Sequence, residues 1–269
     1  MTTDLTLPTE KIIAIADGAL GHVIFNNPER HNAVSLEMWD AVEIALTAFA
    51  EDDQIRVVIL SGAGGKAFVS GADISKFDQE RGSKEATEHY NARLDVVYNM
   101  IEDYPKPTIA MIDGHCIGGG LNLATCADIR IASAKSRFAM PAAKLALGYP
   151  FDAIRRMVNA VGAAAAKQMM FSAKSIDAET ALRLGLVQEV TEEDGLSDRV
   201  DELAVTIAGN APLTVRAMKF IATQVMHRDP AARDLDRCNE VVAACFASED
   251  YVEGRTAFME KRKPEFKGR

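Results

Sequence analysis

Short apolar runs alternate with amphipathic stretches through the first half of the chain. The runs are rich in β-branched residues and predict strands at residues 11–16, 22–26, 55–60 and 109–112. After Ser35, apolar side chains recur every three or four residues as far as Phe49, which predicts an amphipathic helix capped by that serine. A second helix is predicted at 93–103, and the polar stretch 76–92 before it is interpreted as a mobile surface segment. This alternation predicts an α/β core with crossover helices.

The second half of the chain changes to helical spacing. Helices are predicted at residues 162–173, 177–184, 196–207 and 212–225, from beyond Pro230 to 246, and at 251–261. Asp177 is placed to cap one of them, and Gly185 follows its end. The change of pattern divides the chain into a core at 1–195 and a helical region at 196–269.

Composition and charge narrow the class of protein. The chain has 269 residues, of which 48% are hydrophobic and 26% charged, which is enough apolar material for one large domain or a domain with an appended subdomain. The net charge is -9 and no basic run occurs, so we expect no nucleic-acid partner. The same negative charge repels anionic ligands, so any that bind must depend on a few local lysines and arginines.

Cysteine usage and the absence of long apolar stretches bear on location. Cys116, Cys126, Cys238 and Cys245 form no CxxC pair, and we interpret them as buried thiols of a reducing compartment. No stretch approaches the ~20 apolar residues of a membrane span, and the N-terminus is acidic rather than arginine-rich. We therefore expect a cytoplasmic protein without a membrane partner. No clustered His, Cys and Asp spacing indicates a metal site.

The glycine run Gly118–Gly119–Gly120 is the most informative motif. It follows an apolar run and a turn, and it precedes a short helical piece from Leu121 to Thr125. Glycines at the start of a helix let the backbone approach a ligand, and the first N–H groups of the helix are free to bind an anion. Two such N–H groups can form an oxyanion hole, although glycine runs are also common turn devices.

A second motif, in residues 61–74, gives this run a context. The two motifs, in this order and separation, closely resemble the enoyl-CoA hydratase/isomerase (crotonase) superfamily. Three further stretches match in order, at residues 25–35, 127–132 and 184–187, and a fourth closes the chain at 258–266. The resemblance implies an α/β crotonase (ClpP/crotonase-like) fold of repeated ββα units, which carries the CoA and acyl sites, and a C-terminal helical trimerisation region. It also implies a homotrimer or a dimer of trimers (homohexamer) and a substrate that is an acyl-CoA thioester.

The resemblance assigns the oxyanion hole to the N–H groups of Ala72 and Gly119. It implies CoA-binding positions at Arg30, Ala33, Lys66, Ala72, Asp73, Ile74, Lys263 and Phe266. From their position in the sequence, Met140, Tyr149 and Phe151 are expected to line an acyl pocket. No cofactor is expected beyond the coenzyme A of the substrate.

The chain departs from the family at the acid–base positions. Hydratases of the family use two glutamates, and here those positions hold Asn122 and Ala142, with Arg156 fixing the register. An amide cannot accept a proton at neutral pH and alanine has no polar group, so the pair that activates water is missing. Asn122 either donates a hydrogen bond to substrate or water, or bonds local backbone.

Other groups could substitute. Asp152 is either a replacement base or the cap of the helix that begins at Ala153. His115 is either a structural histidine in the interior or, with a carboxylate partner, a water-activating group. The resemblance therefore implies an enzyme of the lyase or isomerase type in lipid metabolism that is not an ordinary hydratase. Double-bond isomerisation, decarboxylation and C–C hydrolysis stay open, and so does a non-catalytic acyl-CoA-binding homologue.

Overall fold

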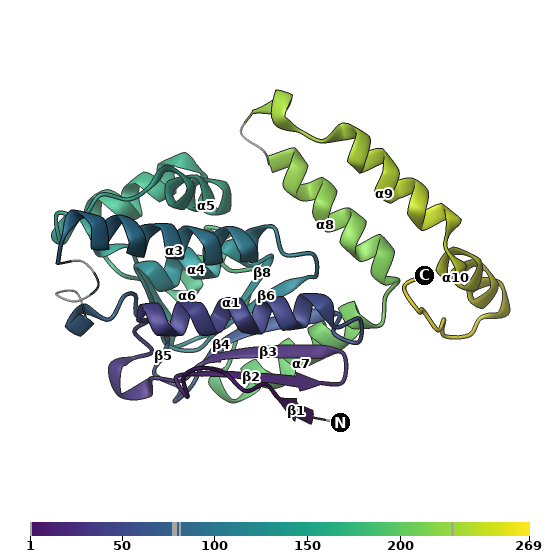
Figure 1. Cartoon of the computed structure of the whole chain (residues 1–269), viewed down its shortest axis with the longest axis horizontal. Coiled ribbons are helices and arrows are strands. Elements are labelled where there is room, and N and C mark those ends of the chain that lie inside the picture. The colour runs from purple at the N-terminus through teal and green to yellow at the C-terminus, as the bar shows by residue number, and fades with distance from the viewer. Residues whose placement is uncertain (1, 77–79, 81, 227–228) are drawn as a thin grey trace.

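The computed structural model describes residues 2–76, 80, 82–226 and 229–269 (Figure 1). A seven-stranded sheet has the order β1-β2-β3-β4-β6-β8-β11. The strands from β3 to β11 are parallel to one another, and β2 runs antiparallel to both of its neighbours, β1 and β3. Its strands are β1 Thr2–Asp4, β2 Ile12–Asp17, β3 Leu20–Phe25, β4 Val57–Gly62, β6 Thr108–Ile112, β8 Ile129–Ser133 and β11 Glu189–Thr191. The strands expected from the apolar runs are confirmed to within two residues at each end.

A smaller sheet lies beside it, with the order β10-β9-β7-β5. Its strands are β5 Ala67–Val69, β7 His115–Ile117, β9 Arg137–Ala139 and β10 Ile176–Asp177. β5, β7 and β9 run parallel and β10 is antiparallel. Each of β5 and β7 follows a strand of the large sheet in the chain, as expected for repeated ββ units.

The helices are α1 Leu36–Glu51, α3 Lys84–Glu102, α4 Gly119–Cys126, α5 Phe151–Ser172, α6 Ala178–Arg183, α7 Leu196–Ala208, α8 Pro212–Met226, α9 Leu235–Ala247 and α10 Glu249–Glu260. α1 begins after Ser35 as predicted. Asp177 caps α6 by accepting a 2.9 Å hydrogen bond from Thr180 N, and Gly185 follows its end with φ +78°. Among the described helices, none has the length and apolar composition to cross a bilayer.

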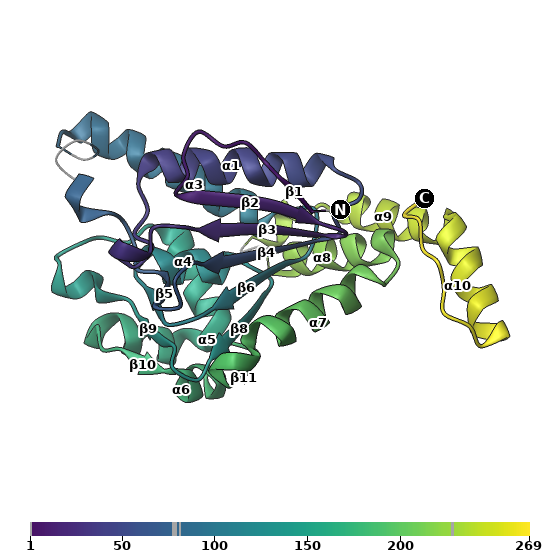
Figure 2. The same cartoon turned by 90° about the horizontal axis from the view of Figure 1, so that it is seen from below.

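The large sheet is buried on both faces, and β4 shows why its sequence is a continuous apolar run. Val58 and Leu60 join the core that includes α1, α3 and α4, whereas Val57 and Ile59 pack with Val200 of α7 on the other face. Successive strand residues point to opposite faces, so a strand covered on both sides needs apolar residues throughout. α7 thus packs on the sheet, and the part of the chain that extends away from it is α8, α9 and α10 (Figures 1 and 2).

The interpretation of residues 76–92 as a mobile segment is wrong for its second half. α3 begins at Lys84, where Ser83 Oγ accepts a 3.1 Å hydrogen bond from Ala86 N. The first turns of α3 are polar because only Tyr90 faces the core there, so the apolar spacing of the helix starts late. Residues 77–79 and 81 lie outside the described residues.

The thiols are free, and their burial differs between the two halves. Cys116 and Cys126 are buried as expected, whereas Cys238 and Cys245 are only half-buried. The latter two lie on α9, which extends away from the sheet, so the expected burial is wrong for them in the isolated chain.

Candidate active site

The backbone of Ala72 lies beside the start of α4. A Cβ atom built on Gly119 would lie 4.0 Å from Ala72 N, and one built on Gly71 would lie 3.6 Å from Gly119 N. Val34 holds this segment, because its N–H donates to Gly71 O at 2.9 Å and its carbonyl accepts from Asp73 N at 2.9 Å. Among the described residues, neither Ala72 N–H nor Gly119 N–H donates to another backbone group. Two free amides therefore lie side by side.

Glycine is required for α4 to take this position. A Cβ on Gly120 would lie 1.9 Å from Val69 O, so only a residue without a side chain lets the helix pack against β5. Gly118 has φ +57° and donates to Ala139 O at 2.8 Å, which ties the turn to β9. The first N–H groups of α4 thus have a fixed direction and the positive end of the helix dipole behind them.

A cavity of about 540 Å³ opens in front of these amides. Ala72 and Gly119 line it, and so do Asn122 and Ala142, the two positions where the family resemblance places glutamates. The predicted positions therefore meet in one place, although they come from three separate segments of the chain.

Asn122 is 4% exposed, and its Oδ1 has no hydrogen-bond partner among the described residues. Its side chain is hydrogen-bonded to Tyr98, and the Tyr98 hydroxyl donates to Gly119 O at 3.2 Å. Burial raises the pKa of Tyr98 well above its usual value, so the hydroxyl stays protonated and can donate. An unpaired buried acceptor costs free energy, and Asn122 Oδ1 has almost no accessible surface, so a bound molecule or water can pair with it only if the side chain turns toward the cavity.

Asp95 of α3 also lines the cavity, and sequence reasoning missed it. Partial burial raises its pKa, the negative charge of Asp152 raises it further, and Arg156 opposes the shift. The available signal was the helical spacing of residues 91, 95 and 98, which is readable only if the helix is known to begin before residue 93.

The structure supports neither of the two roles expected for Asp152, a base in the cavity or the cap of a helix. It lies in the first turn of α5 and pairs with Arg155 Nε at 3.2 Å, and it is not among the described residues that line the cavity. It is not the helix cap either, because α5 begins at Phe151 and Pro150 occupies the cap position. The helix starts earlier than predicted because Pro150 fits a helix boundary.

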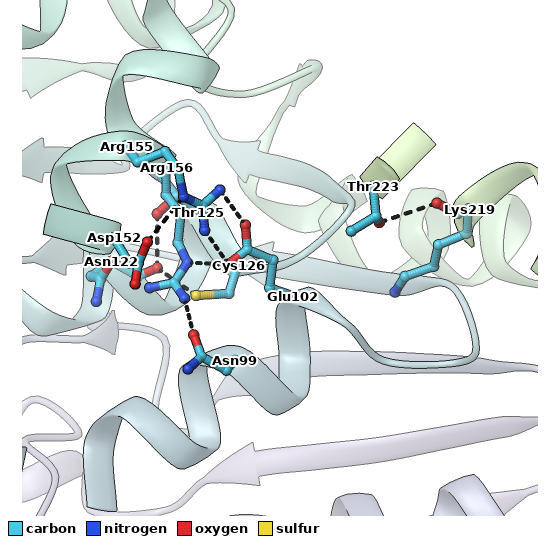
Figure 3. Close-up of polar contacts among 10 residues, drawn as sticks. All are labelled: Asn99, Glu102, Asn122, Thr125, Cys126, Asp152, Arg155, Arg156, Lys219 and Thr223. Atoms are coloured by element: carbon cyan, nitrogen blue, oxygen red, sulfur yellow. Dashed lines mark hydrogen bonds and ion pairs between the residues drawn. The ribbon is translucent and has the colours of Figure 1, made fainter. Parts of the chain in front are cut away.

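A largely buried group of ion pairs joins α3 to α5 (Figure 3). Glu102 accepts from Arg155 and Arg156 at 2.7 Å each, and Arg156 also donates to Asn99 Oδ1 at 2.6 Å. Burial opposes the charge of Glu102, but the two arginines outweigh it and hold its pKa below the ordinary value. Arg156 lies 5.9 Å from the centre of the Tyr98 ring, so the group supports a cavity residue directly.

Of the three residues expected to line an acyl pocket, the structure brings one to this cavity. Tyr149 lines the cavity, but Met140 is buried in the main core and Phe151 is 59% exposed, and neither is among the described residues that line it. Leu145 and Leu147 line it instead. His115 is exposed, not buried, and faces His31 at 6.0 Å between ring centres, outside the cavity.

The positions expected to bind CoA fall into two groups. Arg30 Nη1 lies 3.8 Å from the buried Asp73 carboxylate, which also accepts from Ser75 N and Oγ; Ala33 is buried nearby in the chain. Burial works against the charge of Asp73, yet the bonds from Ser75 and the charge of Arg30 lower its pKa overall. Ile74 begins a short 3₁₀ turn next to them, and Lys66 is exposed before β5.

Lys263 and Phe266 lie elsewhere. Lys263 is exposed in the C-terminal tail, and Phe266 lines a separate cavity with residues of α8, α9 and α10. Neither Lys263 nor Phe266 is among the described residues that line the cavity in front of Ala72 of the same chain.

Comparison with known proteins agrees with this arrangement. The family described as enoyl-CoA hydratase/isomerase matches residues 16–269. The chain is 36% identical to a crotonyl-CoA hydratase of Syntrophomonas wolfei, over 96% of this chain and 98% of that protein. It is 32% identical to a mitochondrial Delta(3,5)-Delta(2,4)-dienoyl-CoA isomerase of Dictyostelium discoideum, over 92% and 87%. The crystal structure of an enoyl-CoA hydratase/carnithine racemase from Magnetospirillum magneticum superimposes with a TM-score of 0.90 at 34% identity, covering 97% of each chain. The chain therefore belongs to the enoyl-CoA hydratase/isomerase family of the crotonase superfamily.

Proposed function

We propose that this protein shifts the double bond of a neutral, unsaturated acyl-CoA thioester through an enolate intermediate. One observation carries the proposal: the free amides of Ala72 and Gly119 face the same cavity as Asn122 and Ala142. Two backbone donors aimed at the thioester oxygen stabilise an enolate, and each such donor typically contributes ~3 kcal/mol. The reaction is then set by the acid–base groups around that enolate.

Hydration of an enoyl thioester needs one group to activate water and one to protonate the α-carbon. Asn122 and Ala142 supply neither, because an amide is not a base and a methyl group is inert. Each missing group costs ~10²–10⁴-fold in rate, so the proposal excludes efficient hydration even though relatives are named as hydratases.

The charge of the cavity argues against decarboxylation. A malonyl-type thioester carries a free carboxylate, and Asp95 is the only charged side chain among the described residues that line the cavity. A negative site without a facing cation repels such a substrate. C–C hydrolysis through His115 loses support because that side chain lies outside the cavity. Isomerisation needs one base and no cofactor beyond the coenzyme A of the substrate.

The CoA moiety is proposed to run along Arg30, Ala33 and the segment 72–74, with Lys66 near its phosphates. Arg30 is 58% exposed and already turned toward Asp73, so its guanidinium is accessible from solvent. Local cations are needed there because the chain as a whole carries a net charge of -9.

The test is a substrate panel with the purified protein. We expect the protein to convert a 3-enoyl-CoA to the 2-enoyl product. We expect negligible hydration of crotonyl-CoA and no decarboxylation of malonyl-CoA. Binding of CoA is measured by calorimetry as a control. Robust hydration of crotonyl-CoA would refute the proposal. Tight CoA binding without turnover of any thioester would instead favour the non-catalytic acyl-CoA-binding homologue.

A further inference from the structure

We infer that Asp95 of α3 is the catalytic base of this site and carries the proton that the two missing glutamates would otherwise handle. This inference rests on the proposed function and names the residue that performs its chemistry. Asp95 comes from a different element than either glutamate position, since Asn122 lies on α4 and Ala142 in the turn after β9.

The placement of α3 brings Asp95 to the cavity that holds the two amides. Asn91, Asp95 and Tyr98 follow helical spacing and all line the cavity. The Tyr98 hydroxyl contacts Gly119 O at 3.2 Å, and Asp95 sits three residues earlier, roughly 4.5 Å along the helix axis. Asp95 is solvent-exposed and lines the same cavity as the Ala72 and Gly119 amides, so its carboxylate borders the space that a thioester held by those amides would occupy.

The surroundings of Asp95 raise its pKa above the ordinary value, which makes the carboxylate a stronger base. The groups that act on its charge are Arg156 and Asp152, both on α5. Arg156 shares its charge with Glu102, whose carboxylate it contacts at 2.7 Å, so Asp95 receives only part of it. Partial burial and Asp152 together raise the pKa of Asp95, and a bound acyl chain would desolvate the carboxylate further.

The proton transfer balances with this single group. The Asp95 carboxylate removes a proton from C2 of the 3-enoyl thioester, and the C–H electron pair forms a dienolate whose oxygen accepts bonds from Ala72 N–H and Gly119 N–H. The protonated Asp95 then returns the proton to C4, while the electrons form the C2=C3 double bond. Nothing is oxidised or reduced, and the carboxylate is regenerated.

The experiment compares Asp95→Asn with Glu88→Gln. Glu88 is a carboxylate of the same helix, 67% exposed, paired with Lys84 at 3.8 Å and outside the cavity lining. Two readouts are taken: isomerisation of a 3-enoyl-CoA, and exchange of the C2 protons of butyryl-CoA in D₂O by NMR. We expect Asp95→Asn to lower both rates by ~10²–10⁴-fold with unchanged CoA binding, and Glu88→Gln to keep both.

The pH profile separates a catalytic from a structural role. Asp152 raises the pKa of Asp95, so Asp152→Asn lowers it, and the acid limb of kcat/KM moves to lower pH. An unmoved limb, or an Asp95→Asn variant that folds and exchanges C2 protons at the normal rate, would overturn the inference.

The exchange readout keeps the two proposals apart. If the protein exchanges C2 protons but does not isomerise, the proposed function fails and Asp95 is still judged by the exchange rate of its variant. If the protein does neither, both fall together.

Discussion

Asn122 and Ala142 line the cavity that holds the two free amides, and in the proposed function they determine which reaction the site can perform. Asn122 presents an unpaired Oδ1 from a side chain that is 4% exposed, an arrangement that costs ~1–3 kcal/mol unless a ligand or water occupies it. We expect Asn122 to contribute to ligand binding through its amide rather than by proton transfer.

Restoring the two carboxylates tests the assignment. We expect the double variant Asn122→Glu, Ala142→Glu to hydrate crotonyl-CoA, with a gain of ~10²–10⁴-fold for each group that works. Hydration is followed by the loss of the enoyl thioester, with each single variant as a control for partial gain. A folded double variant that binds CoA and gains no hydration would show that these positions do not face the β-carbon.

At the scale of elements, the approach of α4 to β5 sets the position of the Gly119 amide beside that of Ala72, the pair proposed as an oxyanion hole. Gly120 is buried against Val69 O, and a Cβ there would lie 1.9 Å from that oxygen. A side chain at position 120 would therefore push α4 away from β5 and shift Gly119 N relative to Ala72 N.

Gly120→Ala is expected to destabilise the protein by ~1–3 kcal/mol and to weaken binding of an acyl-CoA enolate analogue more than binding of free CoA. Thermal unfolding and calorimetry measure the two effects. Gly195→Ala is the matched control, since a Cβ there meets nothing within 4 Å and the residue caps α7 far along the chain. Unchanged binding of the enolate analogue by Gly120→Ala would contradict the proposed amide pair.

Local signals predicted those elements whose ends are marked in the sequence. Ser35 before α1 and Asp177 before α6 both precede helices at the expected place, because helix-start signals and apolar spacing act over a few residues. Asp177 makes the predicted capping bond, whereas the Ser35 hydroxyl has no hydrogen-bond partner among the described residues, so the cap predicted there is wrong. The predicted start of α3, residue 93, is too late because the first turns of the helix are polar. With that start, the shared helix face of residues 91, 95 and 98 cannot be recognised, so Asp95 is missed.

Among the residues predicted at the positions of the missing glutamates and in the acyl pocket, those identified by a motif lie at the cavity, whereas two of those placed only by their position in the sequence do not. Asn122 and Ala142 were found through motifs along the chain, and the cavity confirms that they come together. Met140 and Phe151 were expected in the acyl pocket from position alone and do not line the cavity among the described residues, since Met140 is buried in the main core and Phe151, at the start of α5, is 59% exposed. Side-chain direction depends on packing that no local pattern records.

At the scale of the whole molecule, the C-terminal helices leave much apolar surface uncovered. Met218 of α8, Phe246 of α9 and Phe258 and Met259 of α10 are 63–83% exposed. With Phe266 they line an open cavity of about 880 Å³. Exposed apolar patches of this kind mark interaction surfaces, and α8 to α10 extend away from the sheet rather than fold onto it (Figure 1).

We expect these helices to be covered by further copies of the chain, in a homotrimer or a dimer of trimers, as the family resemblance implies. The double variant Phe258→Glu, Met259→Glu introduces charge at the two most exposed of these side chains, where burial against a neighbour would desolvate it. Light scattering with size exclusion should then give a smaller species than the unaltered protein. Lys84→Glu, a charge change on α3 at a side chain that is 83% exposed, should leave the mass unchanged. A trimer-sized or larger species that survives the double variant would place the subunit contacts elsewhere, and a monomeric unaltered protein would exclude this assembly altogether.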